Sequence, residues 1–157
     1  HIALEFVAMA VSAMVFALSW NLRRIEDNSH AVILGTGFLA VTLIDLAHTL
    51  SFAGMPDLVT PSSPEKAINF WLAARFIAAA ILLAVALRRP AHWSPRRSLG
   101  ALFTALAVSA AVWWLVIVHS AWLPRTFIPG SGLTGLKIGS EYLSLIHILT
   151  LPTILLV

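Results

Sequence analysis

Four apolar stretches, each long enough to cross a membrane, decide which folds are open to this chain. They lie at about 2–20, 31–53, 67–87 and 99–122, and a fifth begins near Leu136 and runs toward the end. A helix needs about 20 mostly apolar residues to span the hydrocarbon core of a bilayer. Because water is absent there, each stretch must satisfy its backbone hydrogen bonds internally, as a helix does. The sequence therefore predicts an all-α, polytopic transmembrane bundle with about five spans.

The composition supports a membrane protein and excludes several kinds of chemistry. Hydrophobic residues make up 59% of the 157 residues and charged residues 11%, and the mean hydropathy is +0.90. A soluble domain has roughly a quarter of its residues charged. Cysteine is absent, which excludes disulfides, thiolate catalysis and Cys-ligated zinc. The expected partner is the lipid bilayer, and no nucleic-acid partner is expected.

The distribution of arginine predicts how the bundle is oriented. The loops at 21–29 and 88–97 carry these arginines: Arg23, Arg24, Arg88, Arg89, Arg96 and Arg97. The loops at 54–66 and 123–135 hold one basic residue each. Lys and Arg accumulate on the cytoplasmic side of membrane proteins. We therefore expect a multi-pass protein whose N-terminus and whose 54–66 and 123–135 loops are extracytoplasmic.

Ionisable residues inside the apolar stretches form the candidate functional site. Such residues are costly in hydrocarbon and usually face inward, pair with one another and serve a function. At a rise of about 1.5 Å per residue, they all fall in the outer half of the bilayer. The inner halves of the same stretches are almost wholly apolar. The predicted signal-binding or ligand-binding layer consists of His1, Glu5, Asp45, His48, Trp71, Arg75, Lys137 and Glu141.

Spacing places these residues on shared helix faces. The pairs at i,i+3 or i,i+4 are Asp45–His48, Trp71–Arg75, Lys137–Glu141 and His1–Glu5. One interpretation is structural, with Arg75 paired to Asp45 and Lys137 to Glu141 only to fix helix packing. The other is a sensing site. We expect His48 to be the signal-sensitive group, because the charge of histidine changes near neutral pH, with Asp45 and Arg75 as its tuning pair.

Two other classes of function remain open at this stage. A transporter or proton-relay fragment also carries ionisable groups in its helices, but it needs a polar route through the inner half. A metal-binding or haem-binding domain would use His48, His1 and a carboxylate, and the oxygen-rich set suits a hard cation. The sequence names no cofactor. No phosphate-binding loop, dinucleotide fingerprint, HExxH motif or nucleophile elbow occurs, so no catalytic residue is predicted.

Several short motifs, taken in order, resemble one known family. They are His1-x-x-x-Glu5, Asp45-x-x-His48-Thr49-Leu50 followed by Gly54-Met55, Trp71-Leu72-Ala73-Ala74-Arg75, Gly132-Leu133-Thr134, and Lys137-Ile138-x-x-Glu141-Tyr142. The family is the membrane-associated sensor domain of the third type, an integral-membrane input module of bacterial signalling proteins. Two positions depart from its pattern: Phe52-Ala53 replaces Tyr-Lys, and Gly135-Leu136 replaces Pro-Phe. The missing cation at Ala53 is expected to alter what binds on the outer side.

The resemblance implies a role in signal transduction. Such a domain lies in the bacterial inner membrane, binds a small ligand or ion, and precedes a cytoplasmic histidine kinase or diguanylate cyclase, often with a PAS domain between. By analogy with two-component sensors, it forms a homodimer. The chain itself carries no catalytic domain, so the output is implied by the resemblance alone.

The last residues are expected to be foreign to the gene. LSLIHI (143–148) translates the transposon end used to prepare sequencing libraries, and TLPT (150–153) translates the adapter bases that follow, after one inserted base at Leu149. The sensor domain is therefore expected to occupy 1–142, truncated at its C-terminus and slightly at its N-terminus. Residues 143–157 are expected to carry no function.

Overall fold

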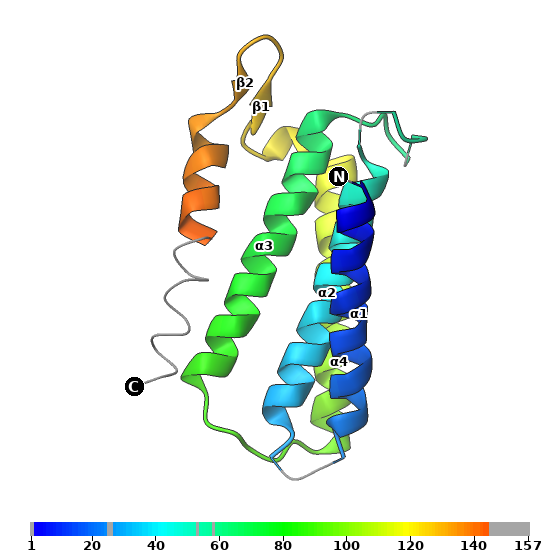
Figure 1. Cartoon of the computed structure of the whole chain (residues 1–157), viewed down its shortest axis with the longest axis vertical. Helices are drawn as coiled ribbons and strands as arrows, with labels where there is room; N and C mark the ends of the chain where they lie inside the picture. The colour runs from blue at the N-terminus through cyan, green and yellow to red at the C-terminus, as the bar shows by residue number, and fades with distance from the viewer. Residues whose placement is uncertain (1, 25–26, 53, 58, 145–157) are drawn as a thin grey trace.

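Four long helices form the body of the molecule in a computed structural model that describes residues 2–24, 27–52, 54–57 and 59–144. The helices are α1 (Ile2–Leu22), α2 (Ser29–Leu50), α3 (Pro64–Leu87) and α4 (Pro95–Val118), and they run up and down beside one another (Figure 1). Each is long and apolar enough to cross a membrane. The predicted all-α, polytopic bundle is confirmed, and no observed end of these four helices differs from its expected position by more than four residues.

A short irregular region follows α4 and leads to a further helical segment. It contains the 3-10 helix η1 (Ser120–Trp122) and a hairpin of two-residue strands, β1 (Phe127–Ile128) and β2 (Gly132–Leu133). The sequence placed residues 119–122 in the fourth span, which instead ends at Val118, and predicted only a loop for 123–135. Residues 135–144 are then helical and lie beside α3 (Figure 1), which agrees with a fifth segment beginning near Leu136. Residues 145–157 lie outside the described residues, so the expected foreign origin of 143–157 stays a prediction.

Helices α3 and α4 begin three and four residues earlier than predicted, and for the same reason. The hydroxyl of Ser63 accepts a hydrogen bond from the backbone N–H of Lys66, and Pro64 occupies the first turn. Ser94 caps α4 in the same way, with Pro95 after it. A serine cap satisfies an otherwise unpaired backbone N–H, and proline is well suited to the first helical turn. The prolines expected to mark loops therefore begin helices.

Helix α2 is the central element of the bundle, since α1, α3 and α4 all pack against it. The apolar core contains these buried residues: Val41, Ile44, Ala47, Phe70, Ala74 and Val116. Trp113 packs against this core: its ring lies edge-on to Phe70, and its indole N–H donates to the carbonyl of Leu43 at 3.1 Å. An indole N–H inside the bundle is thus satisfied by a backbone carbonyl.

Two glycines on α2 allow its neighbours to approach closely. A Cβ atom at Gly35 would lie 2.6 Å from Cβ of Ser19 on α1, and one at Gly37 would lie 2.2 Å from Cδ1 of Ile81 on α3. Small residues have this role in membrane helix packing, because lipid tails provide no hydrophobic force to press helices together.

Replacing Gly35 with leucine is expected to lower the free energy of unfolding by about 1–3 kcal/mol, because the side chain must push α1 away from α2. The matched control is Gly100→Ala on α4, where a Cβ atom would meet nothing within 4 Å. Gly-to-Ala at an open helical site is expected to stabilise by about 0.5–1 kcal/mol. Unfolding in detergent, followed by circular dichroism, measures both. Equal stability of Gly35→Leu and wild type would contradict this account of the α1–α2 contact.

The two ends of the bundle differ in chemistry. We call the end with the C-terminus of α2 and the N-terminus of α3 the polar end, because the ionisable residues of the predicted layer lie near it. We call the other end the basic end, after the arginines in and beside the α1–α2 and α3–α4 connections. Which end faces the cytoplasm stays a prediction from the arginine distribution.

Candidate functional site

The centre of the site is an ion pair between α2 and α3. Nη2 of Arg75 lies 2.8 Å from Oδ2 of Asp45 and donates a hydrogen bond to it. Asp45 is 1% exposed, while the Arg75 side chain is 32% exposed. A buried carboxylate needs such a partner, because desolvation otherwise outweighs its ionisation. The structural pairing expected from the sequence is therefore present.

His48 lies one turn closer to the polar end of α2 and contacts two neighbouring helices. Its Nδ1 is 2.7 Å from the carbonyl oxygen of Ala67 on α3. Its Nε2 is 4.0 Å from Oε1 of Glu5 on α1, which is too far for a hydrogen bond. The ring is nearly buried, and Phe52 packs edge-on against it. One side of this imidazole is thus fixed, and the other faces a carboxylate without bonding to it.

Trp71 connects the ion pair to the helical segment after the hairpin. The centre of its ring is 5.8 Å from Cζ of Arg75 and 5.3 Å from Nζ of Lys137. Both distances fall within the range of cation–π attraction. Nζ of Lys137 also donates to Oε1 of Glu141 at 2.6 Å. The layer therefore continues from α1 through α2 and α3 to residues 135–144.

Some polar atoms in this layer have no hydrogen-bond partner among the described residues although they are buried. They are Oδ1 of Asp45, Nε2 of His48 and Nε of Arg75. Leaving such atoms unsatisfied costs about 1–3 kcal/mol each. Of these three residues, His48 lines a cavity of about 260 Å³, together with Phe52, Ile68, Trp71, Lys137 and Glu141. The site therefore combines unused hydrogen-bonding capacity with room for a small polar group.

Seven of the eight predicted site residues are brought together by the structure. Glu5, Asp45, His48, Trp71, Arg75, Lys137 and Glu141 form the layer just described. His1 lies outside the described residues. Among the residues that are described, no group of three or more His, Cys, Asp or Glu is arranged to hold a metal ion. What the layer binds is a separate question, because geometry alone assigns no ligand.

The sequence did not single out three residues that shape this end of the molecule. Phe52 and Ile68 line the cavity as apolar walls, and nothing in the sequence separates them from ordinary lipid-facing residues. Asn69 is different: its Oδ1 accepts a hydrogen bond from the hydroxyl of Thr126 at 3.1 Å, which ties α3 to the hairpin region. An amide in the outer half of a predicted span was a detectable signal, by the criterion used for the ionisable residues.

Comparison with known families decides the class to which this domain belongs. The sequence model of one family, described as a membrane-associated sensor domain (MASE3), matches residues 1–157. The chain belongs to this family. The resemblance inferred from the ordered motifs is thereby confirmed. No curated protein and no solved structure matches the chain.

The family assignment and the fold agree on the general character of this sensor domain. Four apolar helices make it a multi-pass membrane protein that is in contact with the lipid bilayer. A sensor domain detects a signal and is not itself a catalyst.

Proposed function

We propose that this sensor domain is the input module of a bacterial inner-membrane signalling protein and detects a small ligand, ion or proton through the polar layer. The signal enters from the polar end, and a cytoplasmic histidine kinase or diguanylate cyclase in the same protein receives it. The observation that carries the proposal is the buried Nε2 of His48, which has no hydrogen-bond partner among the described residues, on a side chain that lines a cavity of about 260 Å³. Dimerisation, by analogy with two-component sensors, belongs to the same proposal.

The contacts of His48 support a change in the charge of its imidazole as the first step of signal detection. A carbonyl only accepts hydrogen bonds, so the contact with Ala67 assigns the proton of the neutral ring to Nδ1. Nε2 then carries a lone pair directed at a carboxylate 4.0 Å away, on Glu5. Adding a proton, or a ligand that presents a donor, converts this contact from repulsive to attractive. Closing the gap between Nε2 and Glu5 moves α1 relative to α2.

The remainder of the layer provides a route from α2 to the end of the domain. Asp45 and Arg75 couple α2 to α3, and Trp71 with Lys137 couples α3 to residues 135–144. A shift in one pairing changes the partners of the next, because every cation in the series contacts the Trp71 ring as well as a carboxylate. Displacements of about 1–2 Å between packed helices are a known means of signal transmission.

The proposal is tested by replacing His48 with alanine in the full-length signalling protein and measuring output with and without signal. Output is expected to become fixed, so that the difference between the two states, about 5–150-fold for typical coupled sites, disappears. The matched control is His119→Ala, which removes a histidine after the end of α4 that packs edge-on against Trp114 and stacks on Trp122, two residues outside the layer. The control is expected to respond normally. A His48→Ala variant that inserts in the membrane and responds like wild type contradicts the proposal.

A further inference from the structure

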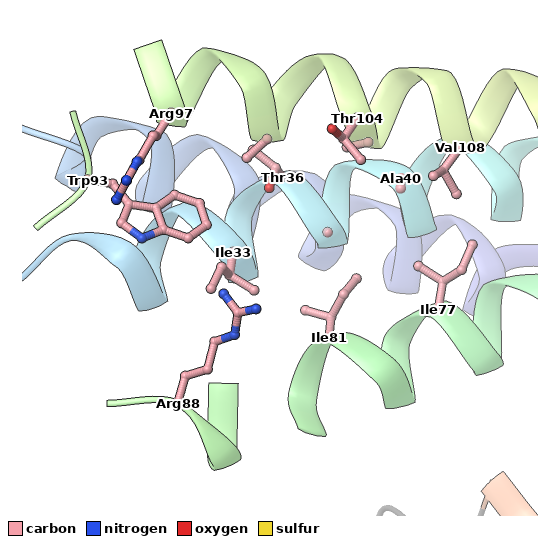
Figure 2. A pocket seen from close by; sticks show the side chains of 13 residues that line it. Ile33, Thr36, Ala40, Ile77, Ile81, Arg88, Trp93, Arg97, Thr104 and Val108 are labelled. Atoms are coloured by element: carbon pink, nitrogen blue, oxygen red, sulfur yellow. The ribbon is translucent and has the colours of Figure 1, made fainter. Parts of the chain in front are cut away.

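A second cavity lies far from the polar layer, at the basic end of the bundle. It is a groove of about 630 Å³ between α2, α3 and α4. Small-ligand sites in proteins have volumes of about 300–1,000 Å³. Figure 2 shows its apolar floor, with Ile33 and Ala40 from α2 facing Ile77 and Ile81 from α3. The proposed sensing site uses none of its residues.

The interior of the groove is suited to a hydrocarbon chain. The single donor of each of its two hydroxyl groups is already used: Thr36 donates to the carbonyl of Val32 at 2.7 Å, and Thr104 to the carbonyl of Gly100 at 2.9 Å. The other residues that line the groove between α2, α3 and α4 below the mouth are apolar. A polar ligand lying along this surface would lose more hydrogen bonds to water than it gains. An acyl chain has no such cost.

Two arginines lie at the mouth of the groove, one on each side. Arg88 follows the last residue of α3, and Arg97 lies in the first turn of α4. Both are exposed, and neither forms an ion pair with any residue that the structure describes. Figure 2 shows both side chains at the same end of the groove, with the Trp93 ring beside Arg97. Guanidinium groups bind phosphate through paired N–H donors.

The mouth is held in shape by hydrogen bonds to the start of α2. Oδ1 of Asn28 accepts from the backbone N–H of Trp93 at 2.7 Å, and its Nδ2 donates to the carbonyl of Trp93 at 3.2 Å. Ser29 and Ala91 exchange two further hydrogen bonds. Asn28 is 1% exposed. The loop that carries Trp93 is thus fixed, and the mouth is formed before any ligand arrives.

The length of the groove matches one leaflet of a bilayer. It extends from Arg88 to Ile77 along α3 and from Arg97 to Val108 along α4. At about 1.5 Å per residue, each distance is about 16 Å. Half of the hydrocarbon core is about 15 Å. The arginines therefore lie at the depth of the headgroups, and the closed end of the groove lies at the depth of the chain ends.

We propose that this groove binds an anionic phospholipid from the leaflet at the basic end, with one acyl chain between α3 and α4 and its phosphate held by Arg88 and Arg97. Basic pockets between membrane helices are typical sites for anionic headgroups. The lipid would bridge α3 and α4 at the end of the bundle opposite the sensing site. This inference does not depend on the proposed function.

The test measures lipid binding to the purified chain in neutral detergent by native mass spectrometry. The probes are dioleoylphosphatidylglycerol, dioleoylphosphatidylcholine and inorganic phosphate. Wild type is expected to prefer the anionic lipid, and the double variant Arg88→Ala/Arg97→Ala to bind it about 10–30-fold more weakly. The matched control is Arg89→Ala/Arg96→Ala, which removes the same charge from the neighbouring positions outside the groove. We expect it to change binding less than about twofold.

A second variant tests the acyl-chain part of the proposal. Ala101 lines the groove on α4, and Ala101→Trp fills the space without changing any charge. It is expected to weaken binding of both lipids. The proposal is overturned if wild type binds the two lipids equally, if both arginine double variants lose affinity to the same extent, or if inorganic phosphate displaces the lipid and so shows that no chain is required.

Discussion

Replacing Arg75 with alanine is expected to lower the free energy of unfolding by about 3 kcal/mol, the lower end of the range for breaking a buried ion pair. The lower end applies because Arg75 is partly exposed, whereas Asp45 is almost completely buried. The loss arises mainly from the stranded carboxylate, whose Oδ1 already has no hydrogen-bond partner among the described residues. Denaturation by increasing SDS in a mild detergent, followed by circular dichroism, measures the change.

A double-mutant cycle separates the ion pair from loss of side-chain packing. The variants Asp45→Ala, Arg75→Ala and the double replacement are compared with wild type, and the double variant is expected to lose about 1–3 kcal/mol less than the sum of the single losses. Arg96→Ala is the control for charge removal, because this exposed arginine pairs with no described residue; it is expected to change stability by less than about 0.5 kcal/mol. Strictly additive single effects would show that the 2.8 Å contact does not stabilise the bundle.

Replacing Lys137 with methionine is expected to uncouple the sensing layer from the output. Lys137 is the residue whose cationic group contacts both the Trp71 ring and Glu141, and its side chain is only 12% exposed. Without it, Glu141 loses the cation with which it pairs, and residues 135–144 lose the contact of Lys137 with the Trp71 ring of α3. The response of the full-length protein, about 5–150-fold for typical coupled sites, is expected to fall toward unity.

One control for Lys137→Met keeps the positive charge at position 137, and the other also removes the negative charge of Glu141. Lys137→Arg retains a cation that can contact both the ring and the carboxylate, and it is expected to respond nearly as wild type does. The double variant Lys137→Met/Glu141→Gln removes the stranded carboxylate and is expected to restore membrane stability without restoring the response. A Lys137→Met protein that still responds fully would show that the signal leaves the layer by another route.

Much of the layer was predictable because ionisable side chains cost free energy in the hydrocarbon core, so their presence in an apolar span indicates pairing or function. An Asp and a His three residues apart on an apolar helix must share a face, and the depth of Arg75 on the next span matches that of Asp45. The observed ion pair agrees with that reasoning. The partner of His48 was not predictable, because Ala67 contributes a backbone carbonyl, and every residue has one. The residues that line the cavity could not be predicted, because the same apolar residue types face cavities and lipid.

The groove at the basic end, unlike the polar layer, was not predicted from the sequence. The sequence assigned its arginines to orientation in the bilayer, and treated the inner halves of the spans as featureless. The structure places Arg88 and Arg97 on the two sides of one groove and leaves Arg89 and Arg96 outside it. Neighbouring residues differ in this way because the direction of each side chain depends on how its helix is rotated against α2. That rotation is set by side-chain packing over the whole length of the bundle.

By itself, the sequence determined the four spans, their helical state and the presence of a polar layer, because hydrophobicity and backbone hydrogen bonding are properties of each segment alone. Only the tertiary structure decided that α2 is central and that a groove opens between α3 and α4. It also decided that Nε2 of His48 has no hydrogen-bond partner among the described residues. These features depend on distances between segments far apart in the chain, and such distances are fixed only when all the helices pack together.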